Sequence, residues 1–471
     1  MSLWSAQEAA LATGGETAGD WQAEGVSIDT RTLQAGDLFV ALADQRDGHD
    51  FVAEALQKGA SAALVSRRPA DVLSDENLLY VQNVQAALEG LACAARHRSA
   101  AQVIAITGSA GKTSTKEMLR VMLQAQGKTH ASYASYNNHW GVPLTLASLP
   151  RDAAFAVVEI GMSNSGEIAP LARLVRPDAA LITTVAPAHL AAFENLEGIA
   201  REKAAIVQGL TAQGYAVLNA EAPCRSVMEQ AVAAKGCQSL WFGSGAAQAR
   251  ITQLSVKDGL MQVMTSIGDL SLKFELHTVG RHFAMNALGA LALLSKLNAD
   301  VEKAARVLAQ WQPAEGRGTR HQLHAPFGAV ELIDDAYNAN PISMQAALDV
   351  LAQATSSRRV AFLGDMKELG ADERAHHSAL AQLPAIRNID LIHTAGPLMA
   401  ALHHSLPVEK RGQHFANAKE MAACVEDLLQ ADDCILVKAS LSSGLRQVVD
   451  AIKIISQSEP DGAARPVERK S

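Results

Sequence analysis

Residues 107–115 read Thr-Gly-Ser-Ala-Gly-Lys-Thr-Ser-Thr, and residues of these types at this spacing suit phosphate binding. Glycines in such a loop let backbone N–H groups turn inward around phosphate oxygens. Lys112 would then reach the β- and γ-phosphates of a nucleotide, and the Thr113 hydroxyl would hold Mg²⁺. The general pattern has a further glycine where this chain has Ile106, so the loop is a shortened G-x-x-G-K-T. The residues expected around the phosphates are Gly108, Ser109, Ala110, Gly111, Lys112, Thr113 and Ser114.

The segments on either side of this loop predict the strand and the helix that a phosphate loop requires. Residues 103–106 form an apolar run typical of a buried strand, and residues 116–123 have helical spacing. A strand, a glycine loop and a helix in that order place the helix N-terminus, with its partial positive charge, at the phosphates. The alternative is a chance Gly-Lys-Thr in a turn, which the flanking elements make the weaker interpretation.

Two residues at later strand ends are candidates for the same edge of the sheet. Glu159 closes an apolar run, and His189 follows the strand predicted at 180–184. Ligands of an open parallel sheet sit at the carboxyl ends of its strands, so Glu159 is placed to hold Mg²⁺ with Thr113. An ordinary strand-end glutamate and a capped loop histidine are the alternatives. Lys203 lies on a predicted helix and is, by sequence alone, most simply a solvated lysine.

Polar clusters also follow three predicted strands in the last third of the chain. Residues 334–341 read Asp-Asp-Ala-Tyr-Asn-Ala-Asn-Pro, 364–370 read Gly-Asp-Met-Lys-Glu-Leu-Gly, and 438–440 read Lys-Ala-Ser. A helix N-cap and a turn would explain the end of the first cluster. Three such clusters at strand ends of one sheet nevertheless favour a substrate-binding face. The polar turn that contains Asn138 is a weaker candidate for contact with a γ-phosphate or a substrate.

The order of the predicted elements divides the 471 residues into three blocks. Residues 1–83 predict a small α/β domain, 84–312 a central domain whose parallel sheet carries the loop, and 313–471 a doubly wound, Rossmann-like domain. Alternating strands and helices are typical of parallel sheets that are covered on both faces. An alternation of apolar and polar residues at 251–277 predicts an antiparallel excursion. The fold class is therefore α/β with three domains, and the polar tail 456–471 is expected to be disordered.

Composition narrows the class of protein. A hydrophobic fraction of 48% with 19% charged residues fits packed cores rather than a disordered chain. The net charge of −8 argues against a nucleic-acid partner, for which a basic stripe is typical. No apolar run approaches the roughly 20 residues of a membrane span, and no signal peptide is visible. The five cysteines are scattered, which favours a reducing compartment, so we expect a soluble cytoplasmic protein.

Together these residues resemble the Mur ligase family, the ATP-dependent amide-forming enzymes of bacterial cell-wall precursor synthesis. The shortened phosphate loop is one mark of the resemblance. Residues 27–31, Ser-Ile-Asp-Thr-Arg, look like part of the family's UDP-binding first domain. Residues 334–341 and 364–370 are most similar to members that add D-alanyl-D-alanine to UDP-N-acetylmuramoyl-tripeptide. The substrate-binding residues that the resemblance implies are Ser27, Asp29, Thr30, Arg31, Asp334, Tyr337, Asn338 and Asn340.

The resemblance also implies roles for residues that sequence alone leaves open. Lys203 aligns with a family lysine that CO₂ converts to a carbamate, which supports a second Mg²⁺. The residues implied to hold the two ions are Thr113, Glu159, His189 and Lys203. Those implied to contact ATP from outside the loop are Asn286 at the adenine, and Arg317 and Asp335 at the ribose and phosphates. Those implied to act in catalysis are Lys112, Lys203, His189 and Asn138. The implied enzyme is a monomer that forms an acyl phosphate from ATP and the tripeptide.

Three positions depart from the family's usual pattern. Phe283 stands where asparagine is usual, and Ala439 and Leu441 stand where relatives commonly have glycine and arginine. If that arginine contacts a substrate carboxylate, either another cation such as Lys438 or Arg446 replaces it, or the dipeptide binds weakly. Three other functions stay open: a ligase that adds diaminopimelate or lysine, a folylpolyglutamate-type ligase and, in a different class, a nucleotide-gated binding protein.

Overall fold

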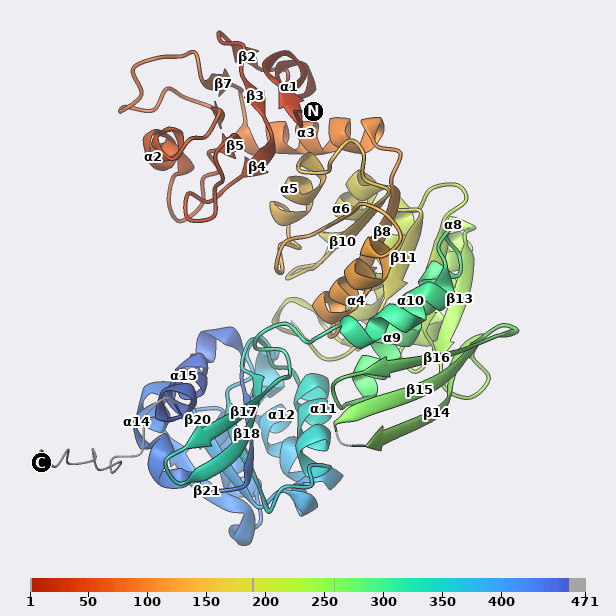
Figure 1. Cartoon of the computed structure of the whole chain (residues 1–471), viewed down its shortest axis with the longest axis vertical. Coiled ribbons are helices and arrows are strands. Elements are labelled where there is room, and N and C mark those ends of the chain that lie inside the picture. The colour runs from red at the N-terminus through yellow and green to blue at the C-terminus, as the bar shows by residue number, and fades with distance from the viewer. Residues whose placement is uncertain (1, 189, 258, 457–471) are drawn as a thin grey trace, which may run out of the picture.

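The computed structural model describes residues 2–188, 190–257 and 259–456, and it contains three large sheets (Figure 1). In the view of Figure 1 the N-terminal sheet lies at the top, a nine-stranded sheet in the middle and a six-stranded sheet at the bottom. The predicted α/β fold class is confirmed. The tail expected to be disordered, residues 456–471, lies outside the described residues except for Ser456.

The first sheet is small and mostly parallel, in the order β2-β7-β6-β5-β4, with only the β2–β7 pair antiparallel. A separate antiparallel pair joins β1 and β3. The strands are β1 (Trp4–Ser5), β2 (Glu16–Thr17), β3 (Gln22–Ala23), β4 (Gly25–Ser27), β5 (Asp37–Val40), β6 (Ala62–Val65) and β7 (Leu78–Tyr80). The helices are α1 (Ala6–Thr13), α2 (Val52–Gln57) and α3 (Val84–Arg98), which leads into the next sheet.

The nine-stranded sheet has the order β16-β15-β14-β13-β12-β11-β8-β10-β9. It is parallel from β9 to β14, and β14, β15 and β16 form an antiparallel meander, so the excursion predicted at 251–277 is confirmed. Its strands are β8 (Gln102–Thr107), β9 (Thr129–Ala131), β10 (Phe155–Glu159), β11 (Ala179–Ile182), β12 (Tyr215–Asn219), β13 (Gln238–Gly243), β14 (Ala249–Lys257), β15 (Leu260–Ile267) and β16 (Leu270–Leu276). Its helices are α4 (Lys112–Gln124), α5 (Gly141–Ala147), α6 (Ile168–Val175), α7 (Leu196–Ala204), α8 (Arg225–Lys235), α9 (Arg281–Leu294) and α10 (Val301–Val307).

The six-stranded sheet has the order β17-β18-β22-β19-β20-β21, and all its pairs are parallel except β17–β18. The two outer strands, β17 and β21, were not expected, because both are polar and only partly buried. The strands are β17 (Thr319–Ala325), β18 (Gly328–Asp335), β19 (Arg358–Gly364), β20 (Leu391–Ala395), β21 (Arg411–Phe415) and β22 (Asp433–Lys438). The helices are α11 (Pro341–Ala352), α12 (Glu373–Ala379), α13 (Met399–Ser405), α14 (Ala418–Leu428) and α15 (Arg446–Ile455).

Local sequence explains where helices α4 and α11 begin. Gly111 precedes α4 in a left-handed conformation, with a φ of 82°, which costs glycine little. Asn340 caps α11: its side chain accepts the N–H of Ser343, and the Ser343 hydroxyl accepts the N–H of Asn340. Pro341 then occupies the first helical position, where a missing N–H costs nothing.

The packed centre of the middle sheet is built around α9, which is buried along most of its length. Leu288, Leu291 and Leu294 are fully buried in one cluster with Ile104 of β8 and Met118 of α4. A helix that is apolar nearly all round must be enclosed, and α9 is enclosed by the sheet, α4 and α10. This cluster therefore supports the strand and the helix on both sides of the phosphate loop.

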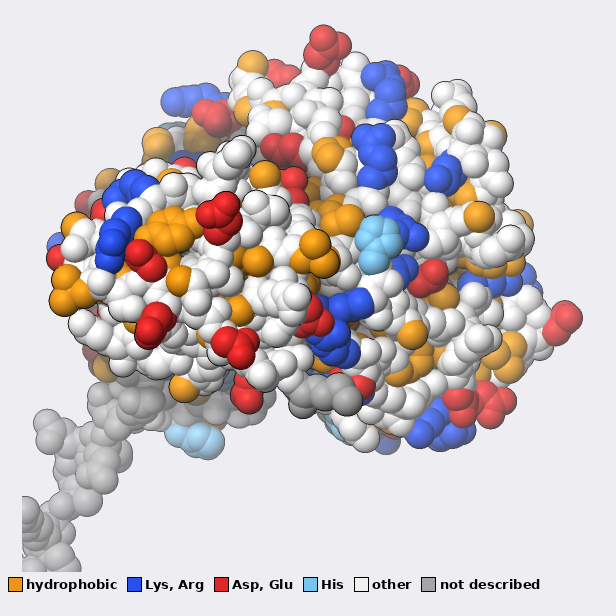
Figure 2. Space-filling model, turned by 90° about the horizontal axis from the view of Figure 1, so that it is seen from above, with side chains coloured by type: hydrophobic (Ala, Val, Ile, Leu, Met, Phe, Trp, Pro, Cys, Tyr) orange, Lys and Arg blue, Asp and Glu red, His pale blue; other side chains and the backbone are white. Residues whose placement is uncertain are grey.

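The surface mixes charges of both signs. On the face shown in Figure 2, acidic and basic side chains are interspersed. Across the described residues, no helix is both long enough and apolar enough to cross a bilayer.

The enclosed position of α9 leads to a stability prediction. Leu291→Ala removes buried methyl groups and leaves a cavity, so the free energy of unfolding should fall by about 2–5 kcal/mol. Urea denaturation followed by circular dichroism measures the change. The matched control is Leu11→Ala, at a leucine that is 86% exposed, where we expect a change within about 0.5 kcal/mol. Equal losses in the two variants would contradict this account of the core.

Candidate active site

The phosphate loop connects β8 to α4, and its backbone passes close to the side chains of Thr183 and Asn286. At Gly108, where φ is 151°, an added Cβ would lie 1.9 Å from Oγ1 of Thr183. At Gly111 an added Cβ would lie 2.7 Å from Oδ1 of Asn286. Both positions therefore require glycine, because only a chain without a Cβ fits and leaves its N–H groups free to turn inward.

Lys112 follows these glycines as the first residue of α4. Its Nζ donates to the carbonyl oxygen of Gly108 at 2.8 Å, so the side chain curls back over the loop. Burial lowers the pKa of this ammonium, the carboxylate of Glu159 opposes the shift, and Arg317 adds to it. A partly buried cation beside the loop would gain strongly from the oxygens of a bound phosphate.

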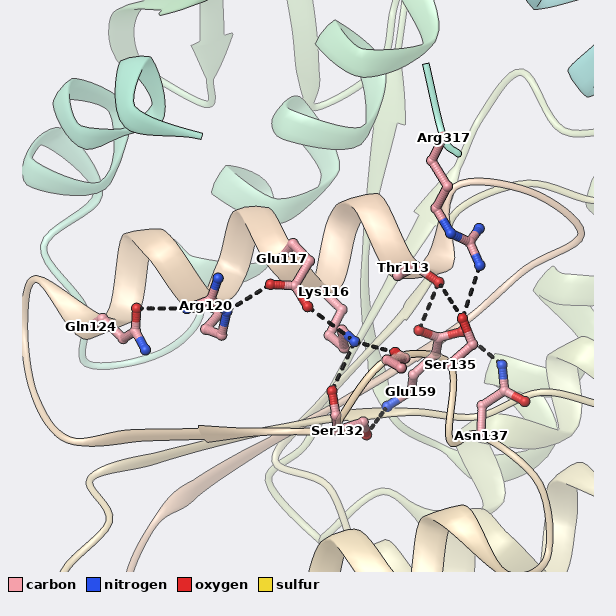
Figure 3. Close-up of polar contacts among 11 residues, drawn as sticks. Thr113, Lys116, Glu117, Arg120, Gln124, Ser132, Ser135, Asn137, Glu159 and Arg317 are labelled. Carbon is pink, nitrogen blue, oxygen red and sulfur yellow. Dashed lines mark hydrogen bonds and ion pairs between the residues drawn. The ribbon is translucent and has the colours of Figure 1, made fainter. Parts of the chain in front are cut away.

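Thr113 and Glu159 meet because their strands are neighbours. Strand β8 pairs in parallel with β10, so the loop after β8 and the last residue of β10 lie at the same edge of the sheet. Oγ1 of Thr113 donates to Oε2 of Glu159 at 3.0 Å, and Nδ2 of Asn137 donates to Oε1 at 2.7 Å (Figure 3). The predicted pairing of the two oxygen donors is thus present in the structure.

The Thr113 hydroxyl and the Glu159 carboxylate suit Mg²⁺ better than a metal ion whose ligands all come from the protein. Among the described residues, no group of three or more His, Cys, Asp or Glu side chains could hold a metal ion. Mg²⁺ typically binds one or two carboxylates and completes its shell with substrate phosphates and water. One hydroxyl and one carboxylate beside a phosphate loop fit that pattern.

A cavity of about 530 Å³ separates the phosphate loop from the six-stranded sheet. Gly111 and Asn286 line one wall, and Arg317, Asp335 and Lys438 line the other. The volume lies within the range of small-molecule sites. The residues predicted to contact ATP from two distant parts of the chain therefore face one space.

Two contacts join the walls of this cavity. Nδ2 of Asn340 donates to the carbonyl oxygen of Ser109 at 3.2 Å. Nη2 of Arg317 donates to Oγ of Ser135 at 2.8 Å (Figure 3). The Arg317 guanidinium also lies 4.3 Å from the centre of the Tyr337 ring. Both side chains come from the last third of the sequence and reach the loops of the nine-stranded sheet.

The three predicted polar clusters also meet at one edge. They follow β18, β19 and β22, and β22 lies between the other two. Nζ of Lys438 lies 2.6 Å from Oδ2 of Asp335 and 2.9 Å from the carbonyl oxygen of Asn338. The N–H of Ser440 donates to the carbonyl oxygen of Asp365 at 3.2 Å. The three clusters therefore lie at one edge of the six-stranded sheet, and their role in substrate binding stays a prediction.

The cations nearest to Leu441 in sequence already have acidic partners. Lys438 pairs with Asp335, while Arg446 contacts Asp334 at 3.3 Å and also contacts Glu315 and Asp450. Leu441 itself is 59% exposed. A substrate carboxylate at this point would have to compete with existing ion pairs for either cation.

Lys203 is a buried lysine on α7 and not the solvated one that sequence alone suggested. Its side chain is 2% exposed, and its Nζ lies 3.9 Å from Sδ of Met162. Burial lowers its pKa well below the ordinary value, and the charge of Lys112 adds to that shift while Glu202 opposes it. Glu202 accepts the N–H groups of Gly166 and Ile168, so its oxygens are already engaged.

The residues predicted in the first domain form a compact turn. Asp29 and Arg31 form a bidentate ion pair, and the Arg31 side chain is 80% exposed. Oγ of Ser27 contacts the backbone of Asp29, and the carbonyl oxygen of Thr30 accepts Nζ of Lys58 at 3.0 Å. The pair leaves the guanidinium open to solvent, where a further anion can reach it.

Comparison with known proteins identifies the family. Three family models match in succession: "Mur ligase family, catalytic domain" at residues 22–98, "Mur ligase middle domain" at 106–294 and "Mur ligase, glutamate ligase domain" at 316–441. UDP-N-acetylmuramoyl-tripeptide–D-alanyl-D-alanine ligase of Escherichia coli is 36% identical over 91% of this chain and 94% of the relative. The chain belongs to the Mur ligase family.

Two further comparisons cover nearly the whole Mur ligase chain. The enzyme of the same name from Rickettsia prowazekii is 31% identical over 95% of this chain and 99% of its own length. A crystal structure of MurF from Acinetobacter baumannii superposes with a TM-score of 0.84 at 29% identity, and covers 96% of this chain and 99% of that one. Mur ligases depend on ATP, which agrees with the phosphate loop described above.

The structure of this Mur ligase also contains site residues that sequence reasoning missed. Asn138, which was predicted, accepts the N–H groups of Trp140 and Gly141 where α5 begins, whereas its neighbour Asn137 reaches Glu159. Ser135, which was not predicted, lies between Thr113 and Arg317. Consecutive amides in one polar turn look alike in sequence, and only the path of the backbone separates them. His189 lies outside the described residues.

The position of Lys112 beside the phosphate loop leads to a prediction for this Mur ligase. Lys112→Ala removes the cation beside the loop, so ATP turnover should fall by at least about 10²-fold while the fold is kept. Steady-state kinetics and thermal melting check both parts. Lys128→Ala, at a half-exposed surface lysine paired with Asp152, is the control and should behave like the wild type. Turnover of Lys112→Ala at the wild-type rate would refute the assignment of the loop.

Proposed function

We propose that this Mur ligase uses ATP to join UDP-N-acetylmuramoyl-tripeptide to D-alanyl-D-alanine. The observation that carries the proposal is a cavity with the phosphate loop on one wall and residues of the polar clusters after β18 and β22 on the other. The names of the Escherichia coli and Rickettsia relatives support the choice of substrates, because both relatives align over nearly their full length.

The proposed reaction needs two steps, because a carboxylate oxygen is too poor a leaving group for direct attack by an amine. First, a carboxylate oxygen of the tripeptide attacks the γ-phosphorus of ATP, and the bond to the β–γ bridging oxygen breaks to release ADP. The neutral amine of the dipeptide then attacks the acyl carbon and loses a proton. The tetrahedral intermediate expels inorganic phosphate as the amide forms.

The residues of this chain have distinct tasks in the proposal. Lys112 and the loop N–H groups stabilise the charge that develops on the phosphates. Thr113 and Glu159 would hold Mg²⁺, which when bound neutralises charge on the transferring phosphoryl group. Arg317 and Asp335 would contact the ribose and phosphates from the opposite wall, with Asn286 proposed at the adenine and Asn138 near the γ-phosphate or the substrate. Closing these walls would exclude water and align the reactants.

The other substrates would occupy the two outer domains. The first domain, proposed to span residues 1–83, would bind the UDP portion through Ser27, Asp29, Thr30 and Arg31. The last domain, proposed to span 313–471, would bind the dipeptide through Asp334, Tyr337, Asn338 and Asn340. One chain carries every residue named here, so the proposal needs no second copy. ATP and a UDP-linked precursor would be available in the cytoplasm, where we propose that the enzyme acts.

Lys203 is proposed to carry a carbamate and, with His189, to support a second Mg²⁺. A neutral amine is required for CO₂ to add, and the lowered pKa of Lys203 supplies one. The reaction forms an N–C bond and releases the amine proton, which leaves an anionic oxygen group on the side chain. A buried cation would be poorly placed beside a metal ion, whereas an oxygen anion suits Mg²⁺.

Phosphate release is the experiment that tests the proposed function. The enzyme with ATP, Mg²⁺ and UDP-N-acetylmuramoyl-tripeptide should release phosphate rapidly only when D-alanyl-D-alanine is added. Diaminopimelate, lysine or glutamate in its place should give the rate without any amine. Robust turnover with diaminopimelate alone would overturn the acceptor but not the ligase. Slow ATP hydrolysis that ignores every carboxylate and amine would instead favour a nucleotide-gated binding protein.

The carbamate predicts a specific pattern of loss and rescue. Lys203→Ala should lower turnover by about 10²-fold because an anionic ligand is lost, and a short carboxylic acid in solution should restore part of it. Lys235→Ala, at an exposed lysine of α8, is the control and should show neither effect. Carbon-13 NMR of active enzyme in labelled bicarbonate measures the carbamate directly. The absence of a carbamate signal from that sample would rule the modification out.

The exposed Leu441 predicts a gain from restoring a cation. Because Lys438 and Arg446 are already paired, Leu441→Arg should lower the KM for D-alanyl-D-alanine by roughly 10-fold or more, the worth of one charge-assisted hydrogen bond. Leu441→Gln, which is polar but uncharged, is the matched variant and should change the KM less. An unchanged KM in Leu441→Arg would mean that another cation already binds the dipeptide carboxylate.

A further inference from the structure

Lys116 is a second lysine of α4, one turn after Lys112, and its side chain is fully buried. Its Nζ donates to the carbonyl oxygen of Ser132 at 2.8 Å and also to that of Ala134 (Figure 3). The carboxylate of Glu117 lies 3.1 Å from the same nitrogen. The ammonium is therefore surrounded by oxygen atoms from its own helix and from the loop that follows β9.

Burying a cation in this way is expensive unless it makes several strong contacts. Removing an ammonium from water costs several kcal/mol, and a well-packed apolar residue often stabilises a core at least as well. Lys116 sits on the same helix as Met118, Leu119 and Met122, which fill the core without any such cost. Stability alone therefore does not account for a lysine at this position. The carbonyl oxygens that it binds point to a role in holding the loop.

The loop that Lys116 binds contacts Thr113 and Glu159, the two residues proposed to hold Mg²⁺. Oγ of Ser132 accepts the N–H of Glu159 at 3.0 Å, and Asn137 donates to the Glu159 carboxylate. Oγ of Ser135 lies 3.4 Å from Oγ1 of Thr113. Through Ser132, Ser135 and Asn137, the segment 132–137 surrounds the pair Thr113–Glu159.

The backbone of this segment needs a restraint. Ala134 adopts a φ of 45°, in the left-handed region that a residue with a side chain seldom occupies. Its carbonyl oxygen is one of the two that Lys116 binds. The next residue, Ser135, accepts the guanidinium of Arg317 from the opposite wall of the cavity. The strained residue thus lies between the buried cation and the contact that joins the two walls.

We propose that Lys116 is a positioning residue for phosphoryl transfer, acting through segment 132–137. By binding the carbonyl oxygens of Ser132 and Ala134, it fixes Ser135 and Asn137 so that Thr113 and Glu159 present their oxygens toward the phosphate loop. The expected effect on phosphoryl transfer rests on the proposed function. The restraint of segment 132–137 by Lys116 does not depend on that function. Sub-ångström placement of such groups matters, because a displacement of about 1 Å can cost about 10²-fold in rate.

Arg120 offers a matched control on the same helix. It shares the carboxylate of Glu117 and contacts Gln124 (Figure 3). Within the described part of the chain, Arg120 forms no hydrogen bond or ion pair with segment 132–137. Arg120→Met therefore removes a charge from α4 and a partner from Glu117 without releasing the segment. Lys116→Met removes the cation that the segment binds and keeps a side chain of similar length.

Hydrogen–deuterium exchange of the full chain without ligands is the first measurement. In the wild type the N–H of Ser132 donates to Val157 and that of Tyr136 donates to Tyr133, so these amides should be protected. Lys116→Met should raise deuterium uptake across 132–137, whereas Arg120→Met should leave uptake there unchanged. This measurement needs no turnover, so it remains valid even if the proposed function fails in the phosphate-release assay.

Kinetics then separates positioning from a merely structural role. Lys116→Met should lower kcat by about 10²-fold and raise the Mg²⁺ concentration for half-maximal turnover by about tenfold, with little change in the KM for the UDP substrate. Arg120→Met should match the wild type in kcat, in Mg²⁺ dependence and in the KM for the UDP substrate. Raised uptake with wild-type kcat and Mg²⁺ dependence would overturn the proposal, and so would unchanged uptake.

A milder variant covers the case in which Lys116→Met does not fold. The side-chain amide of Lys116→Gln can still donate to a carbonyl oxygen, so this variant should lose only part of the restraint. Its deuterium uptake across 132–137 should exceed that of the wild type and of Arg120→Met, and its kcat should be lower than theirs. A folded Lys116→Gln chain that equals Arg120→Met in uptake, kcat and Mg²⁺ dependence would overturn the proposal.

Discussion

The site depends on one constraint: β8 must have a parallel neighbour on each side. Strand β10 on one side ends at Glu159, and β11 on the other is followed by Thr183, whose hydroxyl donates to the loop carbonyl of Ala110. Because parallel strands end at a common edge, both neighbours deliver their side chains to the same loop. The glycines then follow as a requirement, since Thr183 leaves no room for a Cβ at Gly108.

Much of this arrangement could be predicted from the sequence. The phosphate loop, its strand and helix, the partner Glu159 and the polar strand ends all depend on local patterns that have a direct physical meaning. The edge strands β17 and β21 were missed, because polar strands that are half exposed lack the alternation that marks a buried face. The burial of Lys203 and Lys116 was missed for a related reason: a lysine in a helix is normally solvated, and only tertiary packing reveals the exception.

Buried lysines recur in this site, and their surroundings differ. Lys116 has three oxygen partners, which suits an ammonium. Lys203 has a thioether within reach, and burial lowers its pKa, which suits a neutral amine. The same residue type is thus prepared for two chemistries by the polarity of its neighbours. Lys112 lies between these cases, because a single carbonyl oxygen holds it where phosphates would bind.

The contacts of Asn340 with Ser109 and of Arg317 with Ser135 have a thermodynamic consequence. A nucleotide bound in this cavity would touch groups from both sheets, and it would therefore bind the conformation in which the two walls meet more tightly than one in which they are apart. Thermodynamic linkage then requires the reverse: a ligand that favours the conformation in which the walls meet must raise the affinity for the nucleotide by the same factor. A molecule bound to the polar edge of the six-stranded sheet would therefore change the affinity of the phosphate loop for its own ligand, and the reverse, without any contact between the two molecules.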